Sequence, residues 1–450
     1  PHGLPTPPDM PLPIDRLPTD DHTNGWSALL PARVPRPPLQ GELDLDWVVV
    51  GAGYAGVAAA RQLARQQPSA SIALVEAGEV GENASGRNSG FAIDLPHVPS
   101  TSAQSTDQAR RAIRVGRFAL DELNTLVKDH RINCDWARSG RYHVAVTNET
   151  AVNVLKTYAD NLEAWHEPFQ WFGRKRLQER LGTDYYSAGI YTPGTYLMNP
   201  AALVRGLADS LPSQVWLFEN SPIIEAELHG SAPYVRTALG RIRARKVILA
   251  VNAFSQSFGV YRKRQVPVLL FASLSPQLSE SQLALLGAAP TWGLTPAHGV
   301  AGSTLRLTCD KRLMIRQGFE YSPSLRTTEA RRAKAKATNL DLLRRRFPQL
   351  GNLELEHFWM GWLAVSQNHA PAFGQIADNA YAASCCNGSG IVRHTAAGML
   401  IADLALGRKN PLIDDFLVQG TANYIPPRPL RDIGVGLRLA WDVWRGRSEK

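Results

Sequence analysis

Three glycines near the start of the chain have the spacing of a dinucleotide-binding turn. Gly51, Gly53 and Gly56 follow the apolar run 47–50 and open an alanine-rich segment that extends to Arg65. In such a turn the first glycine allows the tight bend, the second lets a pyrophosphate approach the backbone, and the third lets a helix pack on a strand. Free N–H groups at the start of that helix also attract phosphate. The pattern predicts a strand, a turn and a helix that bind a dinucleotide.

A carboxylate follows the second apolar run of the same unit. Residues 72–75 read Ile-Ala-Leu-Val, and Glu76 comes directly after them. A carboxylate at this place can accept hydrogen bonds from both hydroxyls of an adenosine ribose that carries no phosphate. Strand, helix, second strand and acidic terminus together predict a site for FAD or NAD.

The residues beyond Glu76 separate these two cofactors. An NAD domain would continue into another helix and strand, whereas residues 84–91 form a loop of small residues with one arginine, Arg87, and one asparagine, Asn88. A loop of this kind can wrap the diphosphate and ribityl chain of a longer cofactor. This favours FAD, and an NAD dehydrogenase stays as an alternative.

The loop Ala84-Ser85-Gly86-Arg87-Asn88-Ser89-Gly90 resembles the ASGRNxG loop of one branch of the glycine/D-amino-acid oxidase superfamily of flavoproteins. That branch contains the γ-glutamylputrescine oxidoreductases and L-pipecolate oxidases, and the resemblance extends over residues 26–407. It implies an α/β fold, with an FAD-binding Rossmann-like domain of the glutathione-reductase type and an antiparallel-sheet α+β substrate domain. Sarcosine oxidases of the superfamily link their flavin to a cysteine. Gly361 stands at that position here, so the resemblance implies non-covalent FAD.

The same resemblance divides the chain into segments. They are a proline-rich lead (residues 1–43), a discontinuous FAD-binding domain (44–100, 200–260 and 370–410), a discontinuous substrate domain (101–199 and 261–369), and a C-terminal tail (411–450) with an amphipathic helix.

Further cofactor contacts follow from matched positions. Ile223 lies where the superfamily reads the adenine edge through its backbone, and Asn252 lies at the end of a buried strand that closes the FAD domain. The glycines of residues 388–390 precede a helix whose positive end would face the flavin's pyrimidine edge. The full set of predicted cofactor residues is Gly51, Gly53, Ala55, Gly56, Glu76, Ala77, Ser85, Arg87, Asn88, Ser89, Gly90, Ile223, Asn252, Gly361, Gly388, Ser389, Gly390, Ile391 and Val392.

Candidates for the catalytic side chains are fewer. Oxidation of an amine requires its unprotonated form, so His143 or Tyr142, on a predicted substrate-domain strand, could accept the proton, although a single strand histidine is often structural. In related sarcosine oxidases a lysine over the flavin is thought to activate oxygen, and alignment puts Met314 there. A thioether cannot stabilise superoxide as an ammonium does, so oxygen is expected to be a poor acceptor.

A substrate carboxylate would favour a guanidinium, which can bind it with two hydrogen bonds. Arg306, Arg316 and Arg393 are the candidates, and each could equally be a surface residue. Phe91 and Trp362 are predicted to line the substrate pocket.

Composition bounds the protein's class and its surroundings. The chain has 450 residues with 44% hydrophobic and 20% charged, as expected for two globular domains. Its four cysteines show neither disulfide nor metal spacing, so we expect no metal, and no apolar run is long enough to span a membrane. The net charge of +9 lacks any nucleic-acid-binding pattern. We therefore expect a cytoplasmic protein without a nucleic-acid partner.

The C-terminal tail adds an alternative to a purely cytoplasmic location. Ile433, Leu437, Trp441 and Trp444 share one helical face, and arginines surround them. Such a helix could dock on the inner face of the cell membrane, or it could pack on the protein's own surface.

These observations predict an FAD-dependent oxidoreductase that transfers hydride from an amine or amino acid to flavin N5, leaving an imine. The resemblance favours L-pipecolate as substrate and a respiratory quinone as acceptor. A γ-glutamylputrescine-type oxidase that uses O2 is the first alternative. A non-catalytic flavin-binding or electron-transfer subunit is the second.

Overall fold

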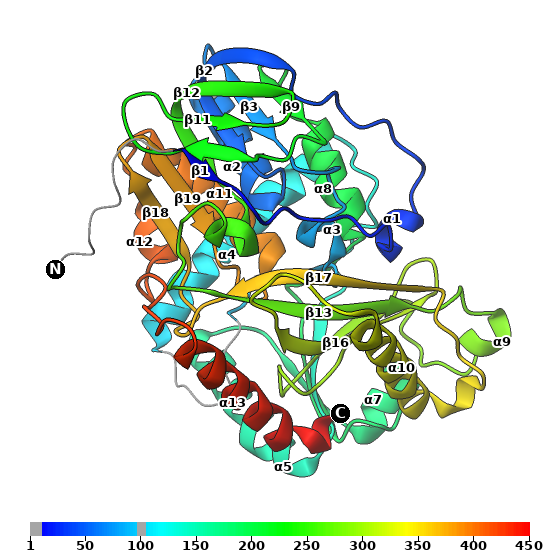
Figure 1. The fold of residues 1–450 in the computed structure, drawn as a ribbon. Helices are drawn as coiled ribbons and strands as arrows, with labels where there is room; N and C mark the ends of the chain where they lie inside the picture. The colour runs from blue at the N-terminus through cyan, green and yellow to red at the C-terminus, as the bar shows by residue number, and fades with distance from the viewer. Residues whose placement is uncertain (1–10, 97–104) are drawn as a thin grey trace.

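The computed structural model describes residues 11–96 and 105–450 of the chain. Two large β-sheets lie one above the other in the view of Figure 1, and helices surround both of them. We call the upper one the cofactor sheet and the lower one the substrate sheet. This two-sheet α/β architecture agrees with the predicted fold class. Residues 1–10 of the proline-rich lead lie outside the described residues.

The cofactor sheet is built around the predicted strand–turn–helix unit. Its order is β1-β10-β11-β12-β2-β3-β9, and β19 pairs with β12 and β18. Strands β19, β12, β2, β3 and β9 run parallel to one another, whereas β11 and β18 pair antiparallel with β12 and β19. The strands are β1 (Leu12–Pro13), β2 (Gly41–Val50), β3 (Ile72–Val75), β9 (Val215–Phe218), β10 (Glu225–Glu227), β11 (Tyr234–Arg236), β12 (Gly240–Leu249), β18 (Ala372–Ala377) and β19 (Ala380–Ser384).

Two helices from opposite ends of the chain cover this sheet side by side. They are α2 (Tyr54–Gln66), which follows the glycine turn, and α11 (Gly390–Ala405), which follows the second glycine cluster. Their apolar faces share one core with the buried residues of β2 and β3. Because both helices begin at the same edge of the sheet, their N-termini come near each other although more than 300 residues separate them.

The substrate sheet has eight strands in the order β17-β13-β16-β15-β14-β5-β7-β6. Its pairs are antiparallel except β14 with β5, which are parallel. The strands are β5 (Arg141–Ala145), β6 (Gln170–Gly173), β7 (Ala188–Thr192), β13 (Val266–Leu274), β14 (Trp292–Pro296), β15 (Thr304–Leu307), β16 (Leu313–Tyr321) and β17 (His357–Val365).

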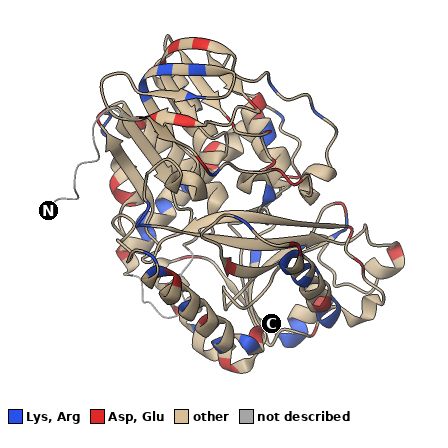
Figure 2. Cartoon of the chain, viewed as in Figure 1, with Lys and Arg blue, Asp and Glu red and all other residues tan. Residues whose placement is uncertain are grey.

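The remaining longer helices are α4 (Thr106–Asp129), α6 (Lys156–Trp165), α7 (Arg174–Leu181), α8 (Pro200–Asp209), α10 (Glu329–Arg346), α12 (Pro411–Phe416) and α13 (Leu430–Arg445). Short elements are α1 (Gly25–Ala28), α3 (Ala84–Arg87), α5 (Asn148–Thr150), α9 (Glu280–Leu283), a π-helical turn (Ala151–Leu155), 3-10 turns (Asn252–Gln256, Pro348–Leu350 and Arg447–Glu449) and the two-stranded pair β4 (Phe91–Ala92) and β8 (Tyr196–Leu197). The basic residues of α10 lie along a solvent-facing helix (Figure 2). Within the described chain, no helix combines the length and the apolar character that a membrane crossing requires.

Helix α4 joins the two layers. The prediction assigns residues 101–199 to the substrate domain, and residues 97–104 of that segment lie outside the described residues. Val115, Ala119 and Leu123 of α4 nevertheless share the core of the cofactor sheet, whereas Ala109 and Ile113 pack with the substrate-sheet core around α6. The boundary therefore falls along this helix, because its buried face extends from one core to the other.

Candidate active site

A cavity of about 650 Å³ is lined by residues of both sheets. The glycine turn after β2 and the end of β12 contribute one wall, and Phe271, Thr295 and Arg316 of the substrate sheet contribute the opposite one. Clefts of this size between two domains are the usual sites for organic cofactors and their substrates.

The glycine turn leaves room for a ligand at the N-terminus of α2. Gly51 has φ +97°, a backbone conformation that favours glycine, and its N–H donates to the Val75 carbonyl at 2.8 Å. A Cβ at Gly53 would lie 2.6 Å from the Ser85 hydroxyl, so only glycine lets the loop at Ser85 close over the helix start. Gly53 caps α2 without a side-chain hydrogen bond, so the backbone N–H groups at the start of this helix suit a diphosphate.

Glu76 lines the cavity at the end of β3. Its carboxylate accepts hydrogen bonds from the backbone N–H groups of Ala52, at 2.7 Å, and Gly78, at 3.3 Å. Burial raises the pKa of Glu76, and these N–H groups offset part of that rise. The acidic residue predicted for the ribose thus lies beside the glycine turn, with Ala55, Ala77 and Ile223 also in the lining.

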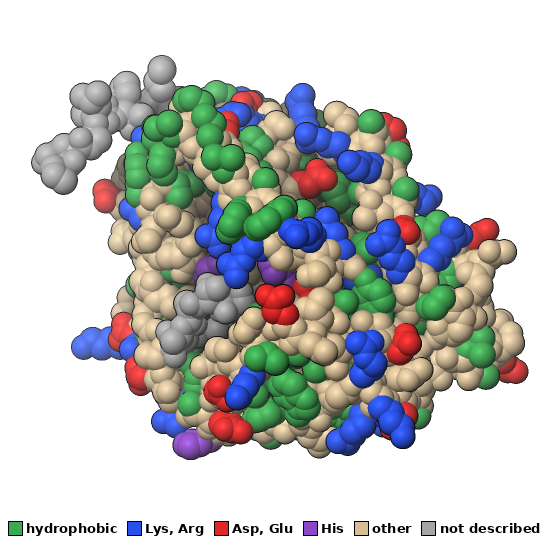
Figure 3. Space-filling view, turned by 90° about the horizontal axis from the view of Figure 1, so that it is seen from below, with side chains coloured by type: hydrophobic (Ala, Val, Ile, Leu, Met, Phe, Trp, Pro, Cys, Tyr) green, Lys and Arg blue, Asp and Glu red, His purple; other side chains and the backbone are tan. Residues whose placement is uncertain are grey.

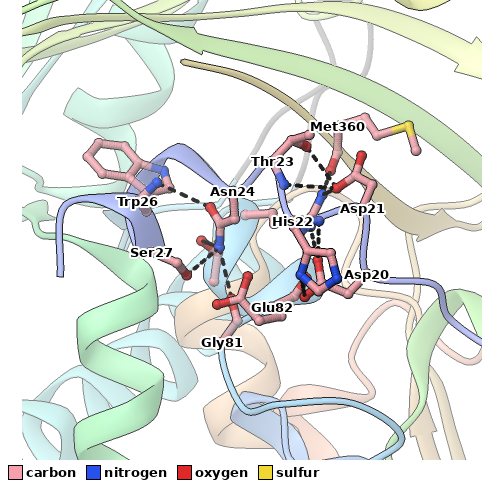
Figure 4. A network of polar contacts seen from close by, with 12 residues as sticks. Asp20, Asp21, His22, Thr23, Asn24, Trp26, Ser27, Gly81, Glu82 and Met360 are labelled. Carbon is pink, nitrogen blue, oxygen red and sulfur yellow. Dashed lines mark hydrogen bonds and ion pairs between the residues drawn. The ribbon is translucent and has the colours of Figure 1, made fainter. Parts of the chain in front are cut away.

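The loop around Arg87 is fixed by the N-terminal lead. The Arg87 guanidinium donates to Asp20 at 2.8 Å and Asp21 at 2.7 Å, and its Nε donates to the Glu82 carbonyl at 2.6 Å. Arg332 of α10 donates to the other oxygen of Asp21 at 2.6 Å. Burial raises the pKa of Asp21, but the two arginines outweigh it and hold that pKa well below its usual range. Figure 4 shows the Asp20–Ser27 segment that makes these contacts.

The lead also supports the backbone of this loop. Asn24 Nδ2 donates to the Gly81 carbonyl at 3.0 Å, and Trp26 Nε1 donates to the Asn88 carbonyl at 2.8 Å (Figure 4 shows both side chains of the lead). Trp359 of β17 donates to the Arg87 carbonyl at 2.9 Å. Ser85, Arg87, Asn88 and Ser89 are therefore held in the cavity wall by both domains.

The second glycine cluster closes the opposite end of the cofactor's predicted path. Gly388, Gly390 and Ile391 line the cavity where α11 begins. His394, one helical turn further, also lines it, and its Nε2 is buried without a hydrogen-bond partner among the described residues. Burial and, to a lesser degree, Arg393 lower the pKa of His394 to about 4, so its imidazole is neutral at pH 7. A buried ring nitrogen without a partner fits a cavity whose ligand supplies the hydrogen-bond partner.

The site therefore fits FAD at three separate points. The backbone cradle of the first turn suits the diphosphate, Glu76 suits the ribose, and the start of α11 suits the electron-accepting ring. Asn252 and Gly361 line the wall between these points. Four predicted residues lie close by but outside the lining: Gly56 beneath the turn, Gly90, Ser389 at the start of α11, and Val392 in the core.

Arg316 is the cation that the substrate sheet presents to the cavity. Its Nη2 donates to Thr304 Oγ1 at 2.7 Å, and both residues line the cavity. Burial alone lowers the pKa of Arg316 to about 10, and no carboxylate within residues 11–96 and 105–450 pairs with it. A guanidinium left with free donors in such a place is suited to bind an anion.

The other two arginine candidates have protein partners. Arg306 is only 2% exposed, and its Nη1 donates to the carbonyls of Ser89, Gly90 and Met198 at 2.7–3.2 Å. Arg393 donates to the His369 carbonyl at 3.3 Å and does not line the cavity. Arg306 therefore supports the cofactor loop, which corrects its predicted contact with substrate.

The two strand candidates for proton transfer lie on opposite faces of β5. His143 lines the cavity, and its Nδ1 is 3.0 Å from Thr295 Oγ1. Tyr142 is buried in the core on the other side of the sheet, where its hydroxyl accepts a hydrogen bond from Arg180. Because side chains alternate along a strand, only His143 can reach the cavity.

Met314 also lies outside the cavity lining. It is fully buried beneath Trp26 and Trp359, on the same face of β16 as Arg316 but two residues away. Its burial away from the cavity lining corrects the predicted position of Met314 over the flavin. Phe91 and Trp362, by contrast, are in the lining as expected.

Several cavity residues were not predicted from the sequence. They are Arg16, Leu17 and Pro18 of the lead, His298, His369 and His394, and Arg438, Asp442 and Arg445 of α13. The position of His394, four residues after Gly390, is the one signal available in the sequence, because that spacing brings two helical residues to the same face. The contacts of the lead and of α13 depend on tertiary packing.

The comparisons with known proteins agree with this geometry. The family model described as FAD dependent oxidoreductase matches residues 46–404. The chain is 25% identical over 386 residues to the "Probable oxidoreductase OrdL" of Haemophilus influenzae, covering 82% of this chain and 85% of that one. It is also 25% identical over 402 residues to the gamma-glutamylputrescine oxidoreductase of Escherichia coli, covering 86% and 90%.

Among solved structures, glycine oxidase from Geobacillus kaustophilus superposes with a TM-score of 0.70 at 18% identity. The match covers 86% of this chain and all of that one. At this identity the likeness shows the fold alone.

Proposed function

The chain belongs to the family of FAD-dependent oxidoreductases and is an FAD-dependent amine or amino-acid oxidoreductase, and we propose that its substrate is an amino acid whose carboxylate binds Arg316. L-pipecolate, a cyclic amino acid, represents the class. The observation that carries this proposal is the Arg316 guanidinium, which faces the cavity with Thr304 as its hydrogen-bond partner and no protein carboxylate nearby among the described residues.

Arg316 would do two things for such a substrate. It would fix the carboxylate by charge-assisted hydrogen bonds, which orients the α-carbon and its amine in the cavity. Its positive charge would also lower the pKa of the substrate's ammonium, because two cations in one buried site repel each other. The reactive free amine is therefore favoured on binding.

His143 is the residue that we propose to accept the amine's proton. It lines the cavity on the substrate sheet, and Thr295 holds its ring through Nδ1. Arg141, which is buried, also donates to Thr295 Oγ1 at 3.4 Å, so a chain of three side chains orients the imidazole. The chemistry that bound FAD supplies is acceptance of two electrons from the C–N unit, which leaves an imine.

The acceptor that we propose for the electrons is a respiratory quinone. Support comes from the cavity lining, which contains no lysine among the described residues. Arginines and histidines are the basic side chains of this lining, so none of them supplies the ammonium that is thought to activate oxygen. A lipid-soluble acceptor would require the enzyme to work at the inner face of the cell membrane.

A second candidate is a γ-glutamylputrescine-type oxidase that uses oxygen. It is favoured by the relative from Escherichia coli and by the mixed charges of Glu149, Asp442 and Arg445 at the outer part of the cavity. Those charges could bind a zwitterionic γ-glutamyl end, with the amine directed inward.

Anaerobic mixing separates these substrates. The purified holoenzyme is mixed without air with L-pipecolate, L-proline, piperidine and γ-glutamylputrescine, and bleaching of the flavin spectrum is followed in time. We expect L-pipecolate to reduce the flavin at least a hundredfold faster, per mole, than piperidine, which lacks the carboxylate. Faster bleaching by γ-glutamylputrescine, with stoichiometric peroxide on readmission of air, would favour the second candidate.

A further inference from the structure

Helix α13 carries an exposed apolar stripe that the other described residues leave uncovered. Leu430, Ile433, Leu437, Trp441 and Trp444 are each 53–67% exposed, and their spacing places them on one face of the helix. The rings of Trp441 and Trp444 stack at 5.0 Å between centroids, which makes a continuous aromatic surface. We infer that this stripe docks on the surface of an anionic lipid bilayer.

The helix is held in place at both of its ends. At its start, Asp432 accepts a hydrogen bond from the Tyr321 hydroxyl at 2.6 Å, and Arg431 donates to the same hydroxyl at 3.1 Å. After its end, the buried Glu449 accepts from the backbone N–H groups of Val146 and Thr147 at 2.9 and 3.0 Å. With both ends fixed, α13 cannot roll to bury its stripe on the protein's own surface.

The charges around the stripe favour anionic lipid. Three acids in this segment are engaged: Asp432 pairs with Arg428, Asp442 pairs with Arg438, and Glu449 is buried. The cations remain exposed: the side chains of Arg428 and Arg438 are 55% and 74% accessible, and Arg447 stacks over Trp444. The face of the molecule seen from below carries groups of hydrophobic side chains with Lys and Arg side chains beside them (Figure 3).

A bilayer suits this arrangement better than a second copy of the chain. Tryptophan and arginine are the residues that prefer the membrane interface, where one end of the side chain is apolar and the other is hydrated. Two copies of α13 packed face to face would instead bring their exposed arginines together, at an electrostatic cost. Each basic residue near an anionic leaflet, by contrast, adds to the attraction.

The face of the same helix next to the stripe belongs to the cavity. Arg438, Asp442 and Arg445 line it, and Gly446 packs closely against His298, another lining residue. Docking through the stripe would thus place the outer part of the cavity at the membrane interface. A lipid-soluble acceptor could then approach the site without crossing water, which would support the proposed acceptor although the docking does not depend on it.

The test is flotation of the purified holoenzyme with vesicles. Vesicles of phosphatidylcholine with phosphatidylglycerol are compared with vesicles of phosphatidylcholine alone, at low and high salt. We expect binding to the anionic vesicles only, weakened by salt. The double variant Trp441→Ser/Trp444→Ser should bind at least tenfold less.

Trp216→Ser supplies the matched control, because Trp216 is a tryptophan on β9 that is 45% exposed, far from α13 in the sequence. This variant should float as the wild type does. Anaerobic flavin reduction without vesicles should be unchanged in both variants, which shows that they fold and keeps this test separate from that of the substrate. Equal flotation of the wild type and the double variant would overturn the inference. A wild-type dimer in solution that the double variant converts to monomer, without vesicle binding, would also overturn it in favour of a second copy.

Discussion

Two arginines on adjacent strands of the substrate sheet differ in what surrounds them. Arg306 of β15 and Arg316 of β16 project from the same face of the sheet, and burial lowers the pKa of each to about 10. Arg306 donates to three backbone carbonyls and lies beneath the rings of Trp26 and Phe91. Arg316 has Thr304 as its hydrogen-bond partner and faces the cavity.

The hydrogen-bond partners of a buried arginine distinguish a structural cation from a functional one in this fold. A buried guanidinium costs free energy unless its donors are used. Arg306 uses Nη1 to fix the cofactor loop, with its Nε left unpaired among the described residues, and Arg87 fixes the same loop through two aspartates. Arg316 retains N–H donors that no protein group accepts among the described residues. Its burial therefore carries a free-energy cost that a bound carboxylate would offset. Structural arginines should therefore stabilise the fold, and Arg316 should not.

The substitution expected to have the largest effect on stability is Arg87→Met. Removing this charge leaves Asp20 and Asp21 with only part of their compensation, so we expect the free energy of unfolding to fall by about 3–5 kcal/mol. FAD should also dissociate more readily, because the loop at Ser85 and Asn88 loses its support. Thermal melting and FAD retention on gel filtration measure both effects. Arg345→Met, which removes an exposed pair with Asp341, should change stability by less than about 1 kcal/mol.

The paired variants Arg306→Met and Arg316→Met should shift stability in opposite directions. Arg306→Met leaves three carbonyls without their donor, and we expect a loss of about 2–4 kcal/mol. Arg316→Met removes a buried cation that lacks a counter-charge, so the substrate-free enzyme should be as stable as the wild type or slightly more stable. Chemical denaturation of the two FAD-loaded variants checks the sign. Equal destabilisation by both would remove the distinction.

A smaller effect concerns His394, a cavity residue whose Nε2 has no hydrogen-bond partner among the described residues. Its pKa is about 4 in the folded protein and 6.5 in the unfolded chain, so the unfolded state binds the proton more readily. Above pH 6.5 the imidazole is neutral in both the folded and the unfolded state, so its titration does not change stability there. As the pH falls from 6.5 to 4, only the unfolded state takes up the proton, and the free energy of unfolding decreases progressively. We expect His394 to account for about 1–3 kcal/mol of that loss. Melting curves of His394→Gln should therefore depend less on pH over this window than those of the wild type.

The sequence predicted most accurately those features of the site that residues close together in the chain determine. Gly51, Gly53 and Glu76 lie within one strand–turn–helix–strand unit, so their spacing alone indicates how they meet. Tyr142 and His143 show where such reasoning ends. The alternation of a strand separates them, but which one faces the cavity depends on the sheet that covers the other.

Contacts between distant segments account for the rest. Nothing near Arg306 or Met314 in the sequence indicates that Trp26 covers them, and the pairing of Arg87 with Asp20 and Asp21 joins segments 66 or more residues apart. The histidines of the cavity come from four separate elements or loops. Such juxtapositions are set by the packing of the two domains rather than by local pattern.

The most direct test of the central claim is a specificity comparison between the wild type and Arg316→Met. Rates of anaerobic flavin reduction are measured for L-pipecolate and for its carboxamide, which keeps the ring and the amine but lacks the charge. We predict that the wild type prefers the carboxylate at least a hundredfold in the second-order rate constant of flavin reduction and that Arg316→Met loses most of this preference, a change of about 3 kcal/mol. A preference that survives unchanged in Arg316→Met would contradict the account, because some other group would then bind the carboxylate.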